Sequence, residues 1–316
     1  MITHRTRALT ALSGKQADYI PHFEMVFHET ERDFNNRVFI GTNFAPWDNS
    51  NTNIRDACRH NASLYIDIAK RFEHSIILVA PLEFPFEKNW KGALDIVKEI
   101  RDISGDEFCI MTHGDPTFKI PTDMMSFSIQ MYEQPDKLHD IAKRKLDSIS
   151  ELYPECEKAG CDGIIMTSDY AMNTGPFLSP SAFAEFIVPY LEKAVTQAHT
   201  SRLKVIKHTD GNILPIIEQI IDTGIDALHS IDPMAGMNIK SIKEKYGHKI
   251  CLCGNVHCAY MQTGTPDQIK ESAEYCLNHG ASGGGYIFST SNCIFRGMPL
   301  ESYDIIHDLW KTKREY

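Results

Sequence analysis

The chain has 316 residues, of which 42% are hydrophobic, so it is long enough to bury a substantial core. Its formal net charge of −10 argues against a nucleic-acid partner, because no basic stripe is available to neutralise phosphates. No apolar run approaches the ~20 residues of a membrane helix, and the N-terminal MITHRTRALTAL lacks a secretory apolar region. We therefore expect a cytoplasmic protein that makes no membrane contact.

The nine cysteines are scattered along the chain, and several fall in apolar surroundings, as Cys109 and Cys276 do. Buried free thiols in a reducing compartment are the ordinary explanation of such a distribution. We expect most of the cysteines to be of this kind.

Short apolar, β-branched runs recur along the chain and predict eight strands. Most of these runs are continuously apolar, which is typical of strands buried on both faces. In chain order they are Tyr19–Phe27, His74–Ala80, Phe108–Gly114, Asp162–Asp169, Leu203–Asp210, Asp226–Asp232, Lys249–Val256 and Gly284–Asn292.

Amphipathic stretches lie between most of these runs and predict helices. The clearest are 89–103, 135–160, 179–199 and 265–280, the last two opened by Ser-Pro and Thr-Pro. Eight strands alternating with helices favour an α/β fold with a single (β/α)8 TIM-type barrel over residues 1–316. An open Rossmann-like sheet is the competing architecture, but no G-x-G-x-x-G follows the first strand. A long polar segment at about 28–60 follows the first strand instead, and we expect it to form a lid or an extra helix.

Polar residues gather at the carboxyl ends of the predicted strands, where a TIM barrel places its active site. The fourth strand ends in Asp169 and Tyr170, and the fifth ends in His208 and Asp210. The other strands contribute Glu24 and His28, His113 and Asp115, His229 and Asp232, Cys253, Asn255 and His257, and Ser289, Ser291, Asn292 and Cys293. This convergence predicts a polar pocket at one end of the barrel.

Bland alternatives exist for several of these residues. Asp210-Gly211-Asn212 has the composition of a tight turn followed by a helix cap, although such a turn does not require His208. Gly283–Gly285 resembles a phosphate loop, but the glycines precede a strand, so we expect a bend. The His, Asp and Cys residues at the strand ends include zinc ligands, yet no C-x-x-C or H-E-x-x-H spacing supports a metal.

The chain resembles the uroporphyrinogen decarboxylase superfamily, which includes corrinoid-linked methyltransferases. The resemblance runs over nearly the whole length, and it implies a (β/α)8 barrel and a homodimer. It is carried by RALTALSGKQADYIP, THGDPTF, AGCDGIIMTSDYAMNTGPFLSP, KHTDGNILPII, GNVHCAYMQTGTPDQIKE and GGGYIFSTSNCIFRGMPLESY.

Departures from the family pattern favour the methyltransferase branch. Decarboxylases grip their substrate's carboxylates with an arginine-rich segment after the first strand, where this chain has the acidic PHFEMVFHETERDF. The methyltransferase branch holds zinc through His-x-Cys after strand five and a cysteine after strand eight. His208 matches this histidine, Asp210 replaces the first cysteine, and the late cysteine falls on Asn292 with Cys293 next to it. The resemblance thus implies zinc on His208, Asp210 and Cys293.

These observations predict an enzyme that moves a methyl group from a small methylated compound, for example a methoxylated one, to a corrinoid protein. His208, Asp210 and Asp169 are the expected catalytic residues, because acid or metal assistance turns a poor heteroatom into a leaving group. The expected substrate-binding residues are Glu24, His113, Tyr170, Asn255 and Asn292. Two alternatives are a carboxy-lyase acting on a different or smaller acid, and a barrel that binds a tetrapyrrole or a corrinoid protein without turnover.

Overall fold

Seven parallel strands form the main sheet of the computed structural model, which describes residues 2–27, 54–80, 82–84, 87–295 and 297–316. The strand order is β1-β4-β5-β8-β9-β10-β11, so each strand lies beside the next main-sheet strand in the chain. The strands are β1 Ile76–Val79, β4 Cys109–His113, β5 Gly163–Met166, β8 Lys204–His208, β9 Ala227–His229, β10 Cys251–Cys253 and β11 Tyr286–Ile287. Two short hairpins, β2 Leu82–Phe84 with β3 Glu87–Asn89 and β6 Ala171–Met172 with β7 Gly175–Pro176, lie outside this sheet.

The segment around His22 closes the sheet into a barrel. His22 forms a parallel bridge with Phe288, and the Phe288 N–H donates to the Pro21 carbonyl at 2.9 Å. On the other side, the Ser75 N–H donates to the His22 carbonyl at 2.6 Å. This segment therefore lies between the β11 region and β1, in the place of the first of eight predicted strands. Its regular pairing is shorter than predicted, with isolated bridges at His22 and Phe27.

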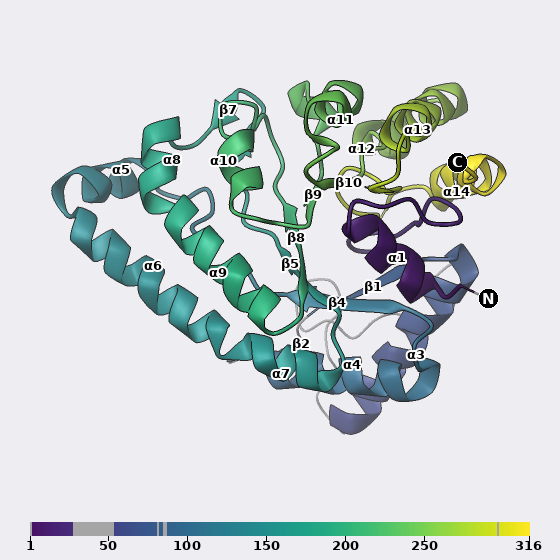
Figure 1. The fold of residues 1–316 in the computed structure, drawn as a ribbon, viewed down its shortest axis with the longest axis horizontal. Coiled ribbons are helices and arrows are strands. Elements are labelled where there is room, and N and C mark those ends of the chain that lie inside the picture. The colour runs from purple at the N-terminus through teal and green to yellow at the C-terminus, as the bar shows by residue number, and fades with distance from the viewer. Residues whose placement is uncertain (1, 28–53, 81, 85–86, 296) are drawn as a thin grey trace.

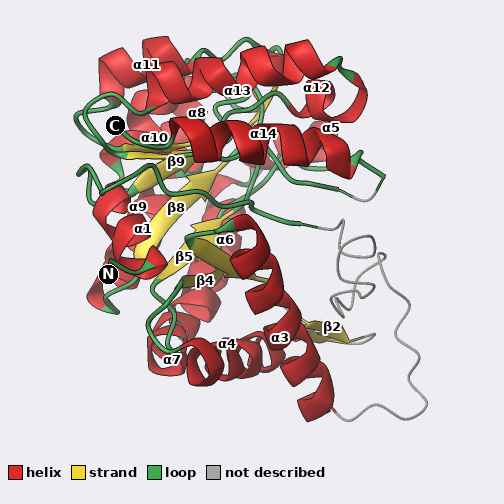
Figure 2. Ribbon diagram, turned by 90° about the vertical axis from the view of Figure 1, so that its right-hand side faces the viewer, coloured by secondary structure: helices red, strands yellow, loops and turns green. Residues whose placement is uncertain are grey.

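Helices surround the barrel, as Figures 1 and 2 show, in the α/β arrangement predicted from the alternating pattern. They are α1 His4–Leu12, α3 Ile54–Phe72, α4 Trp90–Ser104, α5 Met124–Glu133, α6 Pro135–Ser150, α7 Leu152–Ala159, α8 Pro180–Phe186, α9 Val188–Thr200, α10 Ile217–Asp222, α11 Ile239–Tyr246, α12 Cys258–Thr263, α13 Pro266–Gly280 and α14 Leu300–Lys313, with a 3-10 turn η1 Pro233–Ala235. Two of the predicted helices are each divided into two, as α6–α7 and α8–α9. Prolines in the first turns of α7 and α9 (Pro154 and Pro189) lack the N–H that would continue the preceding helix.

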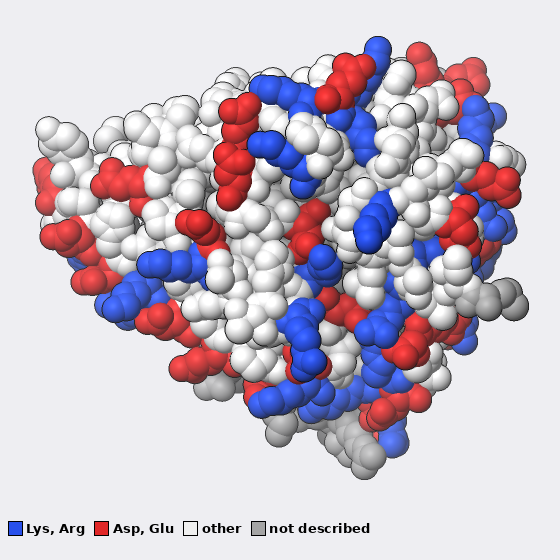
Figure 3. All heavy atoms as spheres, in the orientation of Figure 1, with Lys and Arg blue, Asp and Glu red and all other residues white. Residues whose placement is uncertain are grey.

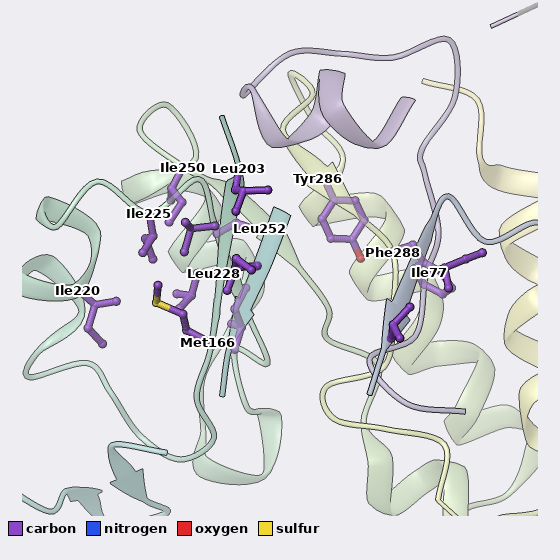
Figure 4. Packing of buried hydrophobic residues seen from close by; sticks show 14 of the residues in the cluster. Ile77, Met166, Leu203, Ile220, Ile225, Leu228, Ile250, Leu252, Tyr286 and Phe288 are labelled. Carbon is purple, nitrogen blue, oxygen red and sulfur yellow. The ribbon is translucent and has the colours of Figure 1, made fainter. Parts of the chain in front are cut away.

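Each strand buries apolar side chains on both faces, which explains the continuously apolar runs. Alternate residues such as Ile76, Leu78 and Ile206 belong to one buried cluster together with Ala8 and Leu12 of α1. The intervening residues belong to a second cluster shared with the surrounding helices. Figure 4 shows part of that second cluster, including Ile77, Met166, Leu228 and Leu252. The first cluster fills the barrel, with α1 packed at one end.

The glycines before β11 form the predicted bend. Gly283, Gly284 and Gly285 have φ of 76°, 79° and 58°, a region that favours glycine. The Gly285 N–H donates to the Lys15 carbonyl at 3.1 Å, and the Lys243 side chain donates to the Gly284 carbonyl. These contacts tie the bend to the loop that follows α1 and to α11.

Other expectations can be compared directly with the described residues. All nine cysteines are free and eight of them are buried, as predicted, with Cys293 half-buried. No helix among the described ranges has both the length and the apolar character needed to cross a membrane. On the face drawn in Figure 3, acidic and basic side chains are interspersed. The predicted lid at 28–60 falls mostly outside the described residues, and its last residues begin α3.

Candidate active site

Three predicted catalytic residues meet at the carboxyl ends of β5 and β8. One ligand atom from each of Asp169, His208 and Asp210 lies within 4.8 Å of the others. His208 Nε2 is 3.9 Å from Asp169 Oδ1 and 3.7 Å from Asp210 Oδ1. The histidine side chain is 4% exposed, whereas the two carboxylates are 43% and 32% exposed. The histidine therefore lies at the buried bottom of the group, and the two carboxylates lie on the side that is open to solvent.

Asp210 is held from two further strand ends. Ser230, which follows β9, donates its hydroxyl to Asp210 Oδ1 at 2.7 Å. Asn292, beyond β11, donates its amide to Asp210 Oδ2 at 2.5 Å. Burial nevertheless raises the pKa of Asp210 to about 6, with Asp169 and Asp232 adding repulsion that the two hydrogen bonds only partly offset. Asp210 therefore holds a carboxylate that readily gains a proton or a cation.

The backbone beside Asp210 is strained. Ser230 has φ of 84° and Ile231 has φ of 48°, both in the left-handed region that bulky residues rarely occupy. Such conformations cost on the order of 1–3 kcal/mol each and are found where the surrounding structure enforces them, often at functional sites. The strain coincides with the point at which the Ser230 hydroxyl meets Asp210.

In the turn after β8, Asn212 and Asp210 have different roles. Asn212 Oδ1 accepts from the Leu214 N–H at 3.1 Å, which is the turn-forming role that we considered for Asp210. Gly211 has φ of 84°, and a Cβ there would lie 2.3 Å from the Ala171 carbonyl oxygen. Glycine is thus required by the turn and by its close packing against β6, while the Asp210 side chain faces His208.

His208 is a neutral histidine. Burial lowers its pKa to about 3, and the nearby Lys207 and His113 add to the effect. Its Nδ1 lies 2.7 Å from Nδ1 of His229, a second buried histidine, at the end of β9. Of these two residues, the sequence pattern assigned a catalytic role only to His208.

A buried ion pair lies next to the site and was not predicted. Lys207 and Asp115 are joined by a 2.8 Å contact, with the lysine side chain 0% exposed and the aspartate 6%. Lys207 also donates to the Ser168 carbonyl at 2.8 Å, and its ammonium lies 4.0 Å from the centre of the Tyr170 ring. Asp115 accepts from the Thr117 hydroxyl and from the Ser168 N–H. This network joins the ends of β4, β5 and β8.

Two predicted substrate-binding residues line a small cavity. Glu24 and His113 border a space of about 40 Å³, together with apolar residues such as Phe27, Ile68 and Leu78. Burial raises the pKa of Glu24 to about 8, although the Thr290 hydroxyl donates to it at 2.5 Å. His113 lies close enough to His208 to lower the pKa of that ring.

Three other predicted site residues do not join the group. The Tyr170 hydroxyl is hydrogen-bonded to Thr117 at 2.6 Å. Asn255 donates to the Ile231 carbonyl and accepts from the Cys276 thiol. Cys293 is half-buried with a pKa raised to about 12, mainly by burial. In the described part of the chain, the third ligand-type side chain beside His208 and Asp210 is Asp169, and not the predicted Cys293.

The donor set of the group suits a hard or borderline metal ion. Two carboxylates and one neutral imidazole are accepted ligands for zinc and for other divalent ions, and they offer no soft thiolate. Burial is the main cause of the raised pKa of Asp210, and repulsion from Asp169 and Asp232 adds to it; a bound cation would relieve that repulsion. Asp169, His208 and Asp210 are thus a group of described side chains whose ligand atoms lie close enough together to hold one metal ion.

Comparisons with known proteins agree with this architecture. The family model described as "Uroporphyrinogen decarboxylase (URO-D)" matches residues 83–312. The chain is 26% identical over 243 residues to the uroporphyrinogen decarboxylase of Photobacterium profundum, and 24% identical over 242 residues to that of Vibrio cholerae. Each alignment covers 69% of this chain and 64% of the relative, so the chain spans less than two thirds of these relatives.

A solved structure, a methyltransferase from Methanosarcina mazei, is similar over almost the whole chain. The TM-score is 0.74 with 21% sequence identity, covering 98% of this chain and 100% of that chain. At this identity, the similarity establishes a shared fold.

Proposed function

Since this chain belongs to the uroporphyrinogen decarboxylase family, we propose that it is an enzyme with Asp169, His208 and Asp210 as its reactive centre. Its proposed reaction is transfer of a methyl group from a small methylated compound, such as a methoxylated one, to a corrinoid protein. The observation that carries this proposal is the convergence of two carboxylates on the Nε2 atom of a neutral, buried histidine. The fold shared with a methyltransferase is consistent with it.

The same three side chains are the proposed ligands of a metal ion, with zinc as the first candidate. When bound, zinc supplies Lewis acidity to the heteroatom that loses its methyl group. His208 offers one nitrogen from a buried position, and Asp169 and Asp210 offer oxygens from the solvent side. Hydrogen bonds from Ser230 and Asn292 hold the Asp210 carboxylate in place.

The remaining predicted residues keep different proposed roles. Asn292 is within hydrogen-bond distance of Asp210, so it can orient both this carboxylate and a substrate beside it. Glu24 and His113 border the small cavity and keep their proposed role in contacting the substrate. Tyr170 and Asn255 have their polar atoms engaged elsewhere, so a substrate role for them requires these hydrogen bonds to exchange.

The test combines metal content with a methyl-transfer screen. The purified protein is loaded with zinc and mixed with cob(I)alamin and with aryl methyl ethers, methylamines or methyl thiols. We expect methylated corrinoid to form from at least one class, and to be lost in His208→Ala. His307→Phe, which alters a buried histidine on α14, serves as the matched control. Absence of methyl transfer with every substrate class would contradict the proposal.

A carboxy-lyase acting on a small or different acid is the second candidate. The family model and the decarboxylase relatives favour it. In that reaction His208, Asp210 and Asp169 would position the acid and deliver a proton to the carbon that loses carboxylate. An enzyme that releases carbon dioxide from a small acid after chelation of metal would support this candidate over methyl transfer.

A further inference from the structure

His208 can present two different faces to the carboxylates, depending on which ring nitrogen carries its proton. With the proton on Nε2, the histidine donates toward Asp169 and Asp210. With the proton on Nδ1, it presents a bare lone pair, which is the form required of a metal ligand. Whether Nε2 of His208 can bind a metal ion therefore depends on whether Nδ1, on the opposite side of the ring, carries the proton.

A chain of hydrogen bonds through the barrel interior bears on this choice. His208 Nδ1 lies 2.7 Å from His229 Nδ1, and His229 Nε2 lies 3.2 Å from Ser289 Oγ. Ser289 Oγ in turn donates to the Thr290 carbonyl at 3.0 Å. Both histidines and Ser289 are buried, with exposed fractions of 3%, 0% and 0%.

The end of this chain sets the direction of every bond in it. A carbonyl oxygen only accepts, so the single proton of Ser289 is used on Thr290, and Ser289 Oγ accepts from His229 Nε2. A neutral His229 protonated at Nε2 has a bare Nδ1, so the proton shared between the two histidines belongs to His208 Nδ1.

We infer that His229 is a positioning residue that fixes His208 as the Nδ1–H tautomer and so turns the Nε2 lone pair toward Asp169 and Asp210. The three facing atoms then carry no hydrogen, and the group becomes a site for a cation. This inference adds a positioning residue to the proposed metal site. Only the effect of the tautomer on metal binding rests on the proposed function. The tautomer itself is a property of the metal-free protein.

Two-bond proton–nitrogen correlation spectra of the 15N-histidine-labelled, metal-free protein test the inference directly. The His208 signals are assigned by their loss in His208→Ala. We expect a protonated Nδ1 and a bare Nε2 on His208, and a bare Nδ1 and a protonated Nε2 on His229. A His208 ring protonated at Nε2 in the wild-type protein would overturn the inference without any variant having to fold.

Variants of His229 test the consequence for the metal. His229→Phe removes the acceptor, and we expect it to weaken zinc affinity about 10–100-fold, the usual cost of losing the partner of a metal-binding histidine. His229→Gln retains an acceptor oxygen and should restore most of that affinity together with the Nδ1–H signal of His208. His307→Phe is the control for replacing a buried histidine elsewhere.

The outcomes separate this inference from the proposed function. If His229→Phe leaves both the tautomer and the zinc affinity of His208 unchanged, His229 has no positioning role. If the wild-type protein shows the expected tautomer but binds no zinc, the metal proposal fails and the role of His229 in setting the tautomer stands.

Discussion

Lys207 and His208 are neighbours at the end of β8, on opposite faces of the strand, and they show two ways of burying a polar side chain. Lys207 is held by Asp115, the Ser168 carbonyl and the Tyr170 ring, so its charge is matched from several sides. His208 is satisfied on one nitrogen by His229, while the other faces two carboxylates beyond hydrogen-bond distance. Lys207 has all its polar contacts within the protein, whereas His208 has one ring nitrogen available to a ligand.

The largest effect on stability should come from breaking the buried ion pair between Lys207 and Asp115. Lys207→Met leaves the buried Asp115 carboxylate without its cation, and we expect the free energy of unfolding to fall by about 3–5 kcal/mol. Urea denaturation measures this. Replacing both residues, as Lys207→Met with Asp115→Leu, should recover most of the loss, because no unpaired charge remains. A loss below about 1 kcal/mol in the single variant would show that the pair is not needed for stability.

His208→Ala should have the opposite balance of effects. We expect it to lower stability only modestly and to weaken metal binding strongly. Its removal leaves His229 Nδ1 without its hydrogen-bond partner, which costs about 1–3 kcal/mol. Zinc content after dialysis, measured by mass spectrometry, should fall to background. Retention of stoichiometric zinc in His208→Ala would remove this residue from the proposed ligand set.

Asp210 should make zinc binding depend on pH, because zinc competes with the proton for the carboxylate. Its pKa of about 6 predicts an affinity that rises from pH 5 to pH 7 and then levels off, and Asp210→Asn should remove most of the rise near pH 6. Competition titrations at several pH values measure the trend. An identical rise in wild-type and Asp210→Asn proteins would assign it to another group.

The same shift predicts a stability change in the metal-free protein. The folded pKa of about 6 lies above the unfolded value of about 3.9, so the folded state holds this proton more tightly. Stability should therefore fall as the pH rises from about 4 through 6. Asp210→Asn should lose that dependence and be the more stable protein above pH 6. Thermal unfolding of the two metal-free proteins between pH 4 and 7 checks the sign.

The smallest effect is expected at Asn292. Asn292→Ala removes a hydrogen bond that lowers the pKa of Asp210, so the pH midpoint of zinc affinity should move upward. A hydrogen bond of about 1 kcal/mol corresponds to a shift of less than about one pH unit. A downward movement of the midpoint would contradict the direction of this contact.

The sequence was sufficient to predict the barrel and the grouping of three polar residues at one end of it. Ile76, Leu78, Ile77 and Val79 show why: alternate residues enter two different cores, so an apolar run marks a strand covered on both faces. Asp169, His208 and Asp210 could be found because polar residues at the ends of parallel strands converge on one end of a barrel.

The Lys207–Asp115 pair could not be found in this way. Strand alternation places residues 207 and 208 on opposite faces, but it does not say which face enters the barrel. The partner of Lys207 lies 92 residues away in the chain. His229 presented a similar difficulty, since a histidine at a strand end has the same appearance whether it contacts a substrate or another histidine.

The loops after β5 and β8 are joined in several consecutive places. The Asp210 N–H donates to Asp169, the Tyr170 N–H to Thr209, and the Asn212 N–H to the Met172 carbonyl. Gly211 packs against Ala171 too closely to admit a side chain. The two carboxylates are therefore brought together when the chain folds, and the conformational entropy of assembling them is lost before any metal or substrate arrives. A metal ion or a substrate therefore binds to carboxylates that are already in place. Its binding free energy is not reduced by the cost of ordering these two loops.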